Sequence, residues 1–125
     1  MSGKRYLLDT NAIVALLKGS TALVKLLQDA EWIGISVISQ IEFLAFSQIS
    51  EEDRKLFEQF LQRVEVINLL ANNNSFIEQI IQTRIQYRLK LPDAIVASSA
   101  LQARAILVTA DQEFVKVTNL IVLNW

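Results

Sequence analysis

The alternation of apolar and polar positions along the chain predicts short strands separated by helices. The apolar runs that we expect to form strands are Arg5–Leu8, Ile33–Val37, Val64–Leu69, Ile106–Thr109 and Leu120–Asn124. The segments expected to be helical are Ala12–Leu17, Thr21–Ala30, Ile38–Gln48, Ser50–Gln62, a stretch from the Asn72–Ser75 cap cluster to about Leu89, and one from Pro92 to about Ala103. A short helical turn is expected before the last strand. This alternation predicts a three-layer α/β domain, with a mostly parallel sheet of about five strands flanked by helices.

Composition narrows the class of protein. The 125 residues fit one domain, residues 1–125, and 52% hydrophobic against 20% charged residues is typical of a folded globular chain. No apolar run is long enough for a membrane helix, so we expect no membrane association. The first residues lead into only three apolar positions before Asp9, and no secretory signal is expected. The absence of cysteine is compatible with a cytoplasmic location.

Two missing residue types limit the chemistry. With no histidine and no cysteine, the chain has no imidazole base, no thiolate nucleophile and no Cys/His zinc site. Any bound metal must rest on oxygen ligands, which favours Mg²⁺, Mn²⁺ or Ca²⁺. The net charge of −1 gives no overall basic field, so a nucleic-acid substrate would have to be attracted by local Lys and Arg and by the metal.

Three aspartates stand where predicted elements begin or end. Asp9 and Asp111 follow the ends of apolar strands, and Asp93 lies in the first turn of an apolar helix. Each could be structural, because Asp9 and Asp111 are suited to cap the following turns and Asp93 favours the positive end of its helix. Ligands of open parallel sheets bind at the carboxyl ends of the strands, so all three are also candidates for a site.

Glu42 is placed less conventionally. On a helical wheel its neighbours are Ile38, Ala45, Phe46 and Ile49, and the polar stripe that includes Ser39 lies elsewhere. A carboxylate on an apolar face is rarely buried unless it is paired or bound to a metal. A salt bridge to an arginine is the structural alternative.

Two arginines form a second unusual set. Arg84 and Arg88 are i,i+4 neighbours on the helix side that carries Ile77 and Ile81, which predicts that they lie off the solvated face. They could pair with the acids or contact phosphate at the mouth of an acidic site. Either role places positive charge close to the carboxylates.

Clustered carboxylates have a chemical use. They repel one another and raise each other's pKa unless a divalent cation neutralises them. A pair of such ions about 3.5–4 Å apart activates water and stabilises both oxygens of a phosphodiester displacement, without any histidine. The residue inventory is compatible with that reaction.

Four segments of the chain resemble the acidic motifs of PIN-domain ribonucleases, in the order of that family. They are Tyr6–Asn11, Ile35–Glu42, Leu91–Ala97 and Leu107–Phe114. The compact form is most similar to the VapC-type toxins of prokaryotic toxin–antitoxin pairs. The resemblance implies that Asp9, Glu42, Asp93 and Asp111 bind Mg²⁺ or Mn²⁺ for endoribonucleolytic cleavage of RNA. It also implies supporting contacts from Thr10 or Asn11 and from Thr109, a homodimer, and inhibition by a cognate antitoxin protein. Many relatives have an aspartate where this chain has Glu113, so the role of Glu113 is open.

Two other classes of protein remain as alternatives. A catalytically silent PIN-like module would bind RNA or protein without cleaving it, and a missing acid would favour it, but none is missing. A phosphotransfer domain of the receiver or haloacid-dehalogenase type would need a further acid beside Asp9. Here Thr10 and Asn11 follow it.

Overall fold

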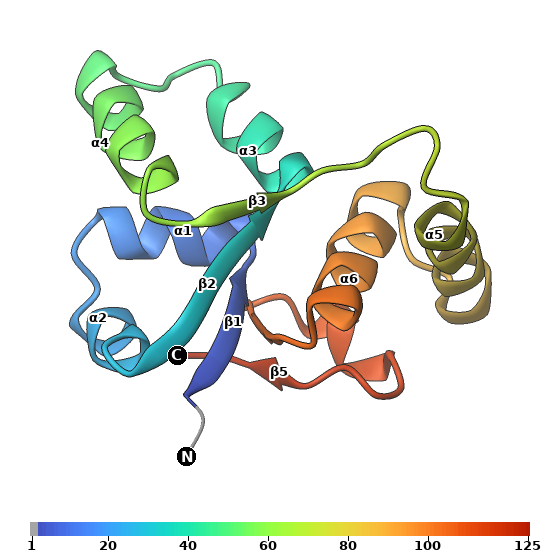
Figure 1. Cartoon of the computed structure of the whole chain (residues 1–125). Coiled ribbons are helices and arrows are strands. Elements are labelled where there is room, and N and C mark those ends of the chain that lie inside the picture. The colour runs from blue at the N-terminus through green and yellow to red at the C-terminus, as the bar shows by residue number, and fades with distance from the viewer. Residues whose placement is uncertain (1–2) are drawn as a thin grey trace.

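A parallel sheet forms the centre of the computed structural model, which describes residues 3–125 (Figure 1). Its strands are β1 (Lys4–Leu8), β2 (Ala30–Ser36), β3 (Glu65–Ile67), β4 (Ile106–Val108) and β5 (Val122–Leu123). They lie in the order β3-β2-β1-β4-β5, and every neighbouring pair is parallel. The predicted fold class, a mostly parallel α/β sheet of about five strands, is confirmed.

Helices cover both faces of the sheet. Those on the side of the first half of the chain are α1 (Thr10–Leu17), α2 (Thr21–Leu27), α3 (Val37–Leu44) and α4 (Glu51–Leu61). Those on the other side are α5 (Asn74–Tyr87) and α6 (Leu91–Ala103), and the turn η1 (Gln112–Lys116) joins β4 to β5. The result is the expected three layers.

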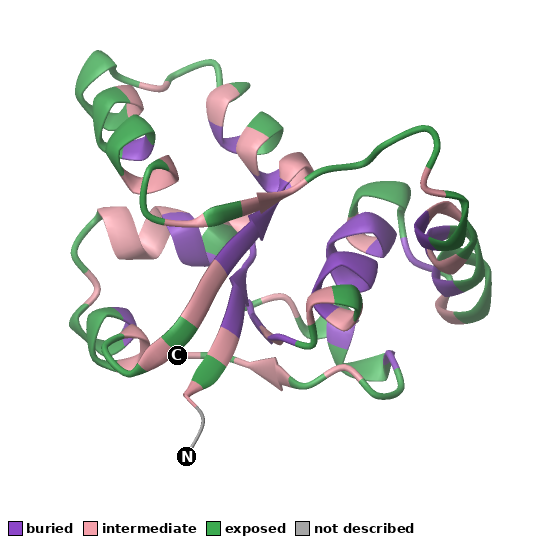
Figure 2. Ribbon diagram, in the orientation of Figure 1, coloured by how far each residue is buried: buried purple, intermediate pink, exposed green. Residues whose placement is uncertain are grey.

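Two separate cores follow from the period of two along β1. Tyr6 and Leu8 pack with Phe43 and Phe57 beneath the first group of helices. Leu7 points to the opposite face and packs in a core built largely by α6, whose residues 94–100 are all buried. Figure 2 shows this burial along β1 and α6. The central strand is therefore buried on both sides and fixed in register.

Local capping explains where several helices begin. Ser50 accepts a hydrogen bond from the Asp53 backbone N–H at 3.0 Å, and Asn73 accepts one from Phe76 N–H at 3.3 Å. Pro92 lies in the first turn of α6, where its missing N–H is tolerated. These three sequence signals are confirmed.

Several predicted helices and strands are longer than those of the structure. The helix expected over Thr21–Ala30 ends at Leu27, because Ala30 already pairs with Lys4 in the sheet. The helix expected over Ile38–Gln48 ends at Leu44, and residues 45–48 are exposed. Strand β3 is limited to the three residues that pair with β2. Packing and strand pairing thus override the local pattern.

No single helix within residues 3–125 is long and apolar enough to cross a membrane. By length and composition alone, α1 and α2 meet that criterion only together, as a pair bent by 109°. The expected domain of residues 1–125 and the expected absence of a secretory signal also involve the first two residues, which lie outside the described part of the chain.

The chain order changes direction beside β1. The segments β1, β2 and β3 step toward one edge, and the chain then returns through α5 and α6 to add β4 and β5 on the other side. Ligands of such sheets bind outside the carboxyl ends of the strands at this switch point. The residues that follow β1, β2 and β4 therefore form the first place to look for a site.

Candidate functional site

Asp9 lies at the carboxyl end of the central strand and is only 8% exposed. Its Oδ1 accepts a hydrogen bond from the Thr10 backbone N–H at 2.9 Å, so it caps α1 as the structural alternative predicted. Its Oδ2 accepts a bond from the Thr109 hydroxyl at 2.8 Å. The cap uses one oxygen only, so capping and a second role are compatible.

Thr109 and Asn11 connect the ends of β1 and β4. Thr109 is 1% exposed, and its Oγ1 also accepts a hydrogen bond from the Asp111 backbone N–H at 3.0 Å. The Asn11 amide donates to Thr109 Oγ1 at 3.2 Å, and its Oδ1 accepts from the Ala110 N–H at 3.0 Å. The Asn11 amide also approaches Asp9 Oδ2 at 3.4 Å. This network holds the Asp9 carboxylate and the turn after β4 in one arrangement.

Asp111 follows the same strand end. Its Oδ1 accepts a hydrogen bond from the Glu113 backbone N–H at 2.9 Å and caps η1. The side chain is half-buried. Asp111 thus resembles Asp9, because it caps a turn while it stands beside the other acids.

Glu42 reaches the site from α3, but the expected burial is wrong. Glu42 is exposed, and its apolar neighbour Phe46 is itself 59% exposed. The buried residues of α3 are instead Ser39 and Phe43, so Ser39, one member of the expected polar stripe, does not face solvent. Glu42 Oε1 accepts a hydrogen bond from the Thr10 hydroxyl at 2.6 Å and has no arginine partner among residues 3–125.

Asp93 lies in the first turn of α6 and is half-buried. Within the described chain its carboxylate accepts no side-chain or capping hydrogen bond, and Lys90 before it caps the helix only through its backbone. Burial raises the pKa of Asp93, and the nearby charge of Asp111 raises it further. Smaller increases come from Asp9 and Glu42. Asp93 is therefore close to all three other acids.

The electrostatics of Asp9 agree with this clustering. Burial raises the pKa of its carboxyl above the ordinary value, and the hydrogen bonds from Thr109 and Thr10 oppose that rise. The charges of Glu42 and Asp111 add to it. The four predicted acids thus share one electrostatic environment at the carboxyl edge of the sheet.

The four acids offer only oxygen donors, which suits Mg²⁺ or Mn²⁺. As they stand, no three acidic side chains within residues 3–125 are grouped closely enough to hold a metal ion. Their mutual effect on pKa and the absence of hydrogen bonds to Asp93 fit a set that a divalent cation would neutralise. We regard the donor chemistry as suitable.

The prediction for the two arginines of α5 is wrong in one respect. Arg84 and Arg88 are both exposed, and neither forms an ion pair with an acid in the described part of the chain. The helix buries Phe76, Ile80 and Thr83, whereas Ile81 is 42% exposed. Of the two apolar residues that suggested a buried side for the arginines, Ile81 is therefore exposed and Ile77 is only partly buried.

Two lysines near the acids were not predicted. Lys116 Nζ donates to Glu113 Oε1 at 2.9 Å, and this bond lowers the pKa of Glu113. Lys90 lowers the pKa of Asp93 and that of Glu113, and it is the weakest of the causes that act on either acid. The i,i+3 spacings of Lys90 to Asp93 and of Glu113 to Lys116 were visible in the sequence and could have indicated both contacts.

An apolar hollow of about 340 Å³ borders the site between α1, α3 and α4. Its rim includes Thr10 and Glu42, and its walls include Phe43, Phe46 and Ile49. Thr10 and Glu42, which are joined by a hydrogen bond, thus also border this apolar hollow, which could receive an apolar segment.

The family of the chain is clear from comparison with known proteins. The PIN domain model matches residues 6–120, and the chain belongs to this family. The family predicted from the acidic motifs is confirmed. Among curated protein sequences none matches significantly.

Solved structures give the same fold. The chain is 28% identical to a chain of VapBC2 from Rickettsia felis bound to a promoter DNA fragment, with a TM-score of 0.80 over 97% of this chain and 98% of that one. It is 25% identical to a chain of a toxin–antitoxin complex from Klebsiella pneumoniae, with a TM-score of 0.77 over 94% and 95%. VapBC-1 from nontypeable Haemophilus influenzae has a chain 25% identical, with a TM-score of 0.73 over 97% and 98%.

Proposed function

We propose that this chain is a divalent-metal-dependent endoribonuclease and the toxin of a toxin–antitoxin pair that acts in the cytoplasm. The observation that carries the proposal is the shared electrostatic environment of the four acids Asp9, Glu42, Asp93 and Asp111. They stand at the carboxyl edge of the sheet in a chain without histidine or cysteine. Membership of the PIN family and the likeness to chains of VapBC and other toxin–antitoxin complexes support it.

Each side chain has a distinct part in this proposal. The four acids would hold Mg²⁺ or Mn²⁺, which supplies an activated water and positive charge for the phosphodiester oxygens. Thr109 and Asn11 fix the Asp9 carboxylate, and Thr10 orients Glu42. Glu113 is already bonded to Lys116, so we place it at the rim rather than among the ligands.

The proposed antitoxin would bind in the apolar hollow between α1, α3 and α4. Phe46 projects there with 59% of its surface exposed, and the hollow ends at Glu42. A segment seated on Phe46 would bury that surface and lie against the site acids. Binding and inhibition would then be one event.

A second copy of the chain is proposed for another apolar surface. A groove of about 460 Å³ lies between α5, α6 and the segment before α5, and its lining includes Leu70, Ile81 and Leu91. These three side chains are 55%, 42% and 50% exposed. Covering them in a homodimer would remove apolar surface from water.

The test of the nuclease is loss of cleavage by conservative variants. Purified Asp9→Asn and Asp93→Asn should fold, as judged by circular dichroism, and should lose Mn²⁺-dependent cleavage of RNA. Asp29→Asn is the matched control, because Asp29 is exposed and lies outside all four motifs. Full activity in either site variant would remove that residue from the mechanism. If the parent binds RNA in Mn²⁺ but does not cleave it, the chain would be a binding module rather than a nuclease.

A further inference from the structure

The last turn of α5 and its connection to α6 expose three cations in seven residues. Arg84, Arg88 and Lys90, which we call the basic strip, are all exposed. Within residues 3–125 none of them forms an ion pair with an acid. Their charges are therefore available to a ligand.

The backbone directs the strip outward. Arg88 ends α5 in the left-handed conformation with φ 54°, and its N–H donates to Arg84 O. The next residue, Leu89, is 4% exposed and packs in the core, and its N–H also donates to Arg84 O. Leu89 is anchored in the core, and the flanking residues Arg88 and Lys90 are exposed to solvent.

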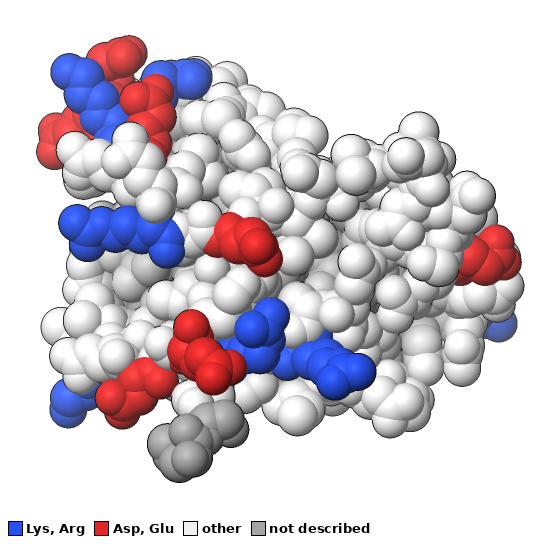
Figure 3. Space-filling model, viewed as in Figure 1, with Lys and Arg blue, Asp and Glu red and all other residues white. Residues whose placement is uncertain are grey.

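The strip lies in an unusually basic part of a weakly acidic chain. From the start of α5 to the residue that caps α6, residues 74–104 contain four cations, the three of the strip and Arg104, against two acids, Glu78 and Asp93. Around α4 the balance differs, and Figure 3 shows cations and anions mixed over that helix. The positive charge of the α5–α6 segment is thus only partly offset locally.

One end of the strip lies next to an acid of the site. Lys90 is the N-cap residue of α6, three residues before Asp93. Arg84 and Arg88 lie further from Asp93 along the chain, within α5 and at its C-terminal end. The strip therefore begins at the acids with Lys90 and extends away from them through Arg88 to Arg84.

We propose that Arg84, Arg88 and Lys90 bind the phosphate backbone of single-stranded RNA and lead it to the acid cluster. The inference rests on the proposed nuclease function and adds the surface that holds its substrate. A polyanion that approaches four carboxylates is repelled unless cations stand nearby, and the overall charge of −1 supplies no attraction. Backbone contacts of this kind give affinity without sequence preference.

The experiment measures binding without cleavage. The full chain and a triple variant, Arg84→Gln with Arg88→Asn and Lys90→Gln, are titrated against a short fluorescent single-stranded RNA of mixed sequence in EDTA. Anisotropy is followed between about 50 and 200 mM salt. The slope of log K against log salt is negative, and removing three phosphate contacts should make it less steep by about 2, at about 0.7 per contact.

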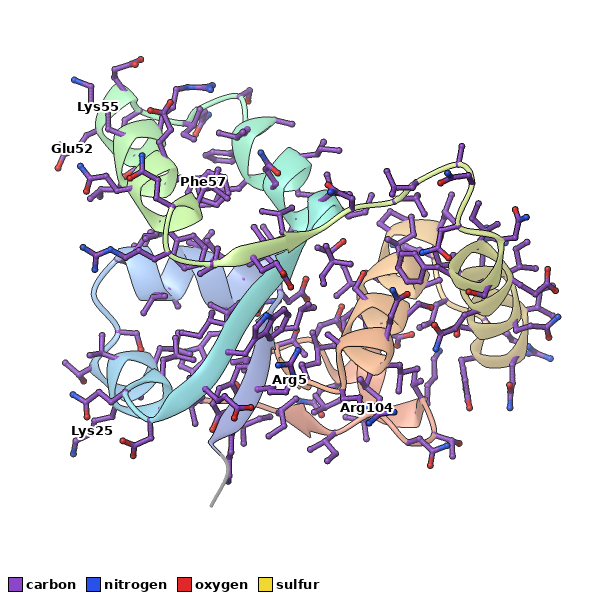
Figure 4. The ribbon with its side chains drawn as sticks, in the orientation of Figure 1. Arg5, Lys25, Glu52, Lys55, Phe57 and Arg104 are labelled. Carbon is purple, nitrogen blue, oxygen red and sulfur yellow. The ribbon has the colours of Figure 1, made fainter. Side chains whose placement is uncertain are left out.

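A closely matched control exists at the other end of α6. Arg104 is an exposed arginine that caps a helix with the same φ of 54° as Arg88, and Figure 4 shows it at the end of α6 remote from Lys90. Asparagine tolerates this conformation, so Arg88→Asn and Arg104→Asn remove equal charge at equal backbone cost. Arg104→Asn should leave the slope unchanged, as should Lys25→Gln on α2.

The outcomes separate this inference from the nuclease itself. If the parent binds RNA with a slope that depends on the strip but does not cleave RNA in Mn²⁺, the strip proposal stands and the nuclease proposal fails. If the parent cleaves RNA and the triple variant has the same slope as the parent, the nuclease proposal stands and the strip proposal fails. An equal loss of slope in Arg104→Asn, or no RNA binding by the parent, also overturns it. A change of oligomeric state in the triple variant with the slope unchanged identifies a protein interface instead and overturns the RNA assignment.

Discussion

The two halves of the acid site are held in different ways. The half on the strand ends, Asp9 and Asp111, is tied by hydrogen bonds to Thr109 and to the turns that follow the strands. The half on the helices has fewer restraints, because Glu42 has one bond, to Thr10, and Asp93 has none within the described chain. The strand half is arranged in advance, whereas the helix half is held by that single hydrogen bond and by the packing of its helices, and it is able to adjust to a ligand.

The largest effect should come from breaking the strand half. Thr109→Val keeps the shape of the side chain but removes a buried hydroxyl that serves both Asp9 and Asp111. We expect the free energy of unfolding in urea to fall by about 1–3 kcal/mol, with nearly complete loss of cleavage. The pKa of Asp9 should rise further, because this bond lowers it in the native protein.

Thr10→Val is the matched change in the helix half. It removes the bond to the exposed Glu42, so the loss of stability should stay below about 1 kcal/mol. Equal destabilisation by the two variants would show that the two halves are held alike.

Metal binding should stabilise the folded protein by drawing the two halves together. Mg²⁺ or Mn²⁺ at 100 times its Kd should add about 2.7 kcal/mol, seen as a higher melting temperature. Asp93→Asn should reduce this increase, because it removes a helix-borne donor and leaves the strand half intact. No increase in the parent at saturating metal would contradict the proposed cofactor.

A smaller effect is expected from pH in metal-free protein. The pKa values of Asp9 and Asp93 are raised above their unfolded value of 3.8, so the folded chain takes up protons at higher pH than the unfolded chain. Above the raised pKa values, the two ionised carboxylates therefore lower the free energy of unfolding. This destabilisation disappears as the pH falls to 3.8. Asp93→Asn should raise the melting temperature at neutral pH and flatten its dependence on pH, and a steeper dependence would contradict the raised pKa.

The smallest effect should come from Glu113. Its carboxylate is exposed and bonded to Lys116, so Glu113→Gln should barely change the melting temperature. Cleavage should persist, since we place Glu113 outside the ligand set. Loss of activity comparable to that of Asp9→Asn would place Glu113 within it.

The sequence predicted best what depends on local pattern. The five strands, the caps at Ser50 and Asn73 and the positions of Asp9 and Asp111 just after β1 and β4 all follow from short-range signals. Asp9 was ambiguous between a cap and a site residue, and the structure makes it a cap whose second oxygen accepts a hydrogen bond from the Thr109 hydroxyl. A single sequence could not separate roles that one side chain performs together.

What failed depends on tertiary packing. A helical wheel shows which residues share a face but not which face is covered. Phe46 and Ile81 were taken as signs of buried faces, and both are exposed. The expected environments of Glu42, Arg84 and Arg88 were wrong for that reason, as were the helix ends that packing decides.

The hydrogen bond from Thr109 to Asp9 has a consequence for synthesis of the protein. It joins residues 100 positions apart, so β4 can pair with β1 only after residues 1–109 have left the ribosome. A nascent chain that ends before β4 therefore carries Asp9, Glu42 and Asp93 without the partner that holds the first of them. If the proposed cleavage depends on this bond, the chain would become active only after β4 had been synthesised.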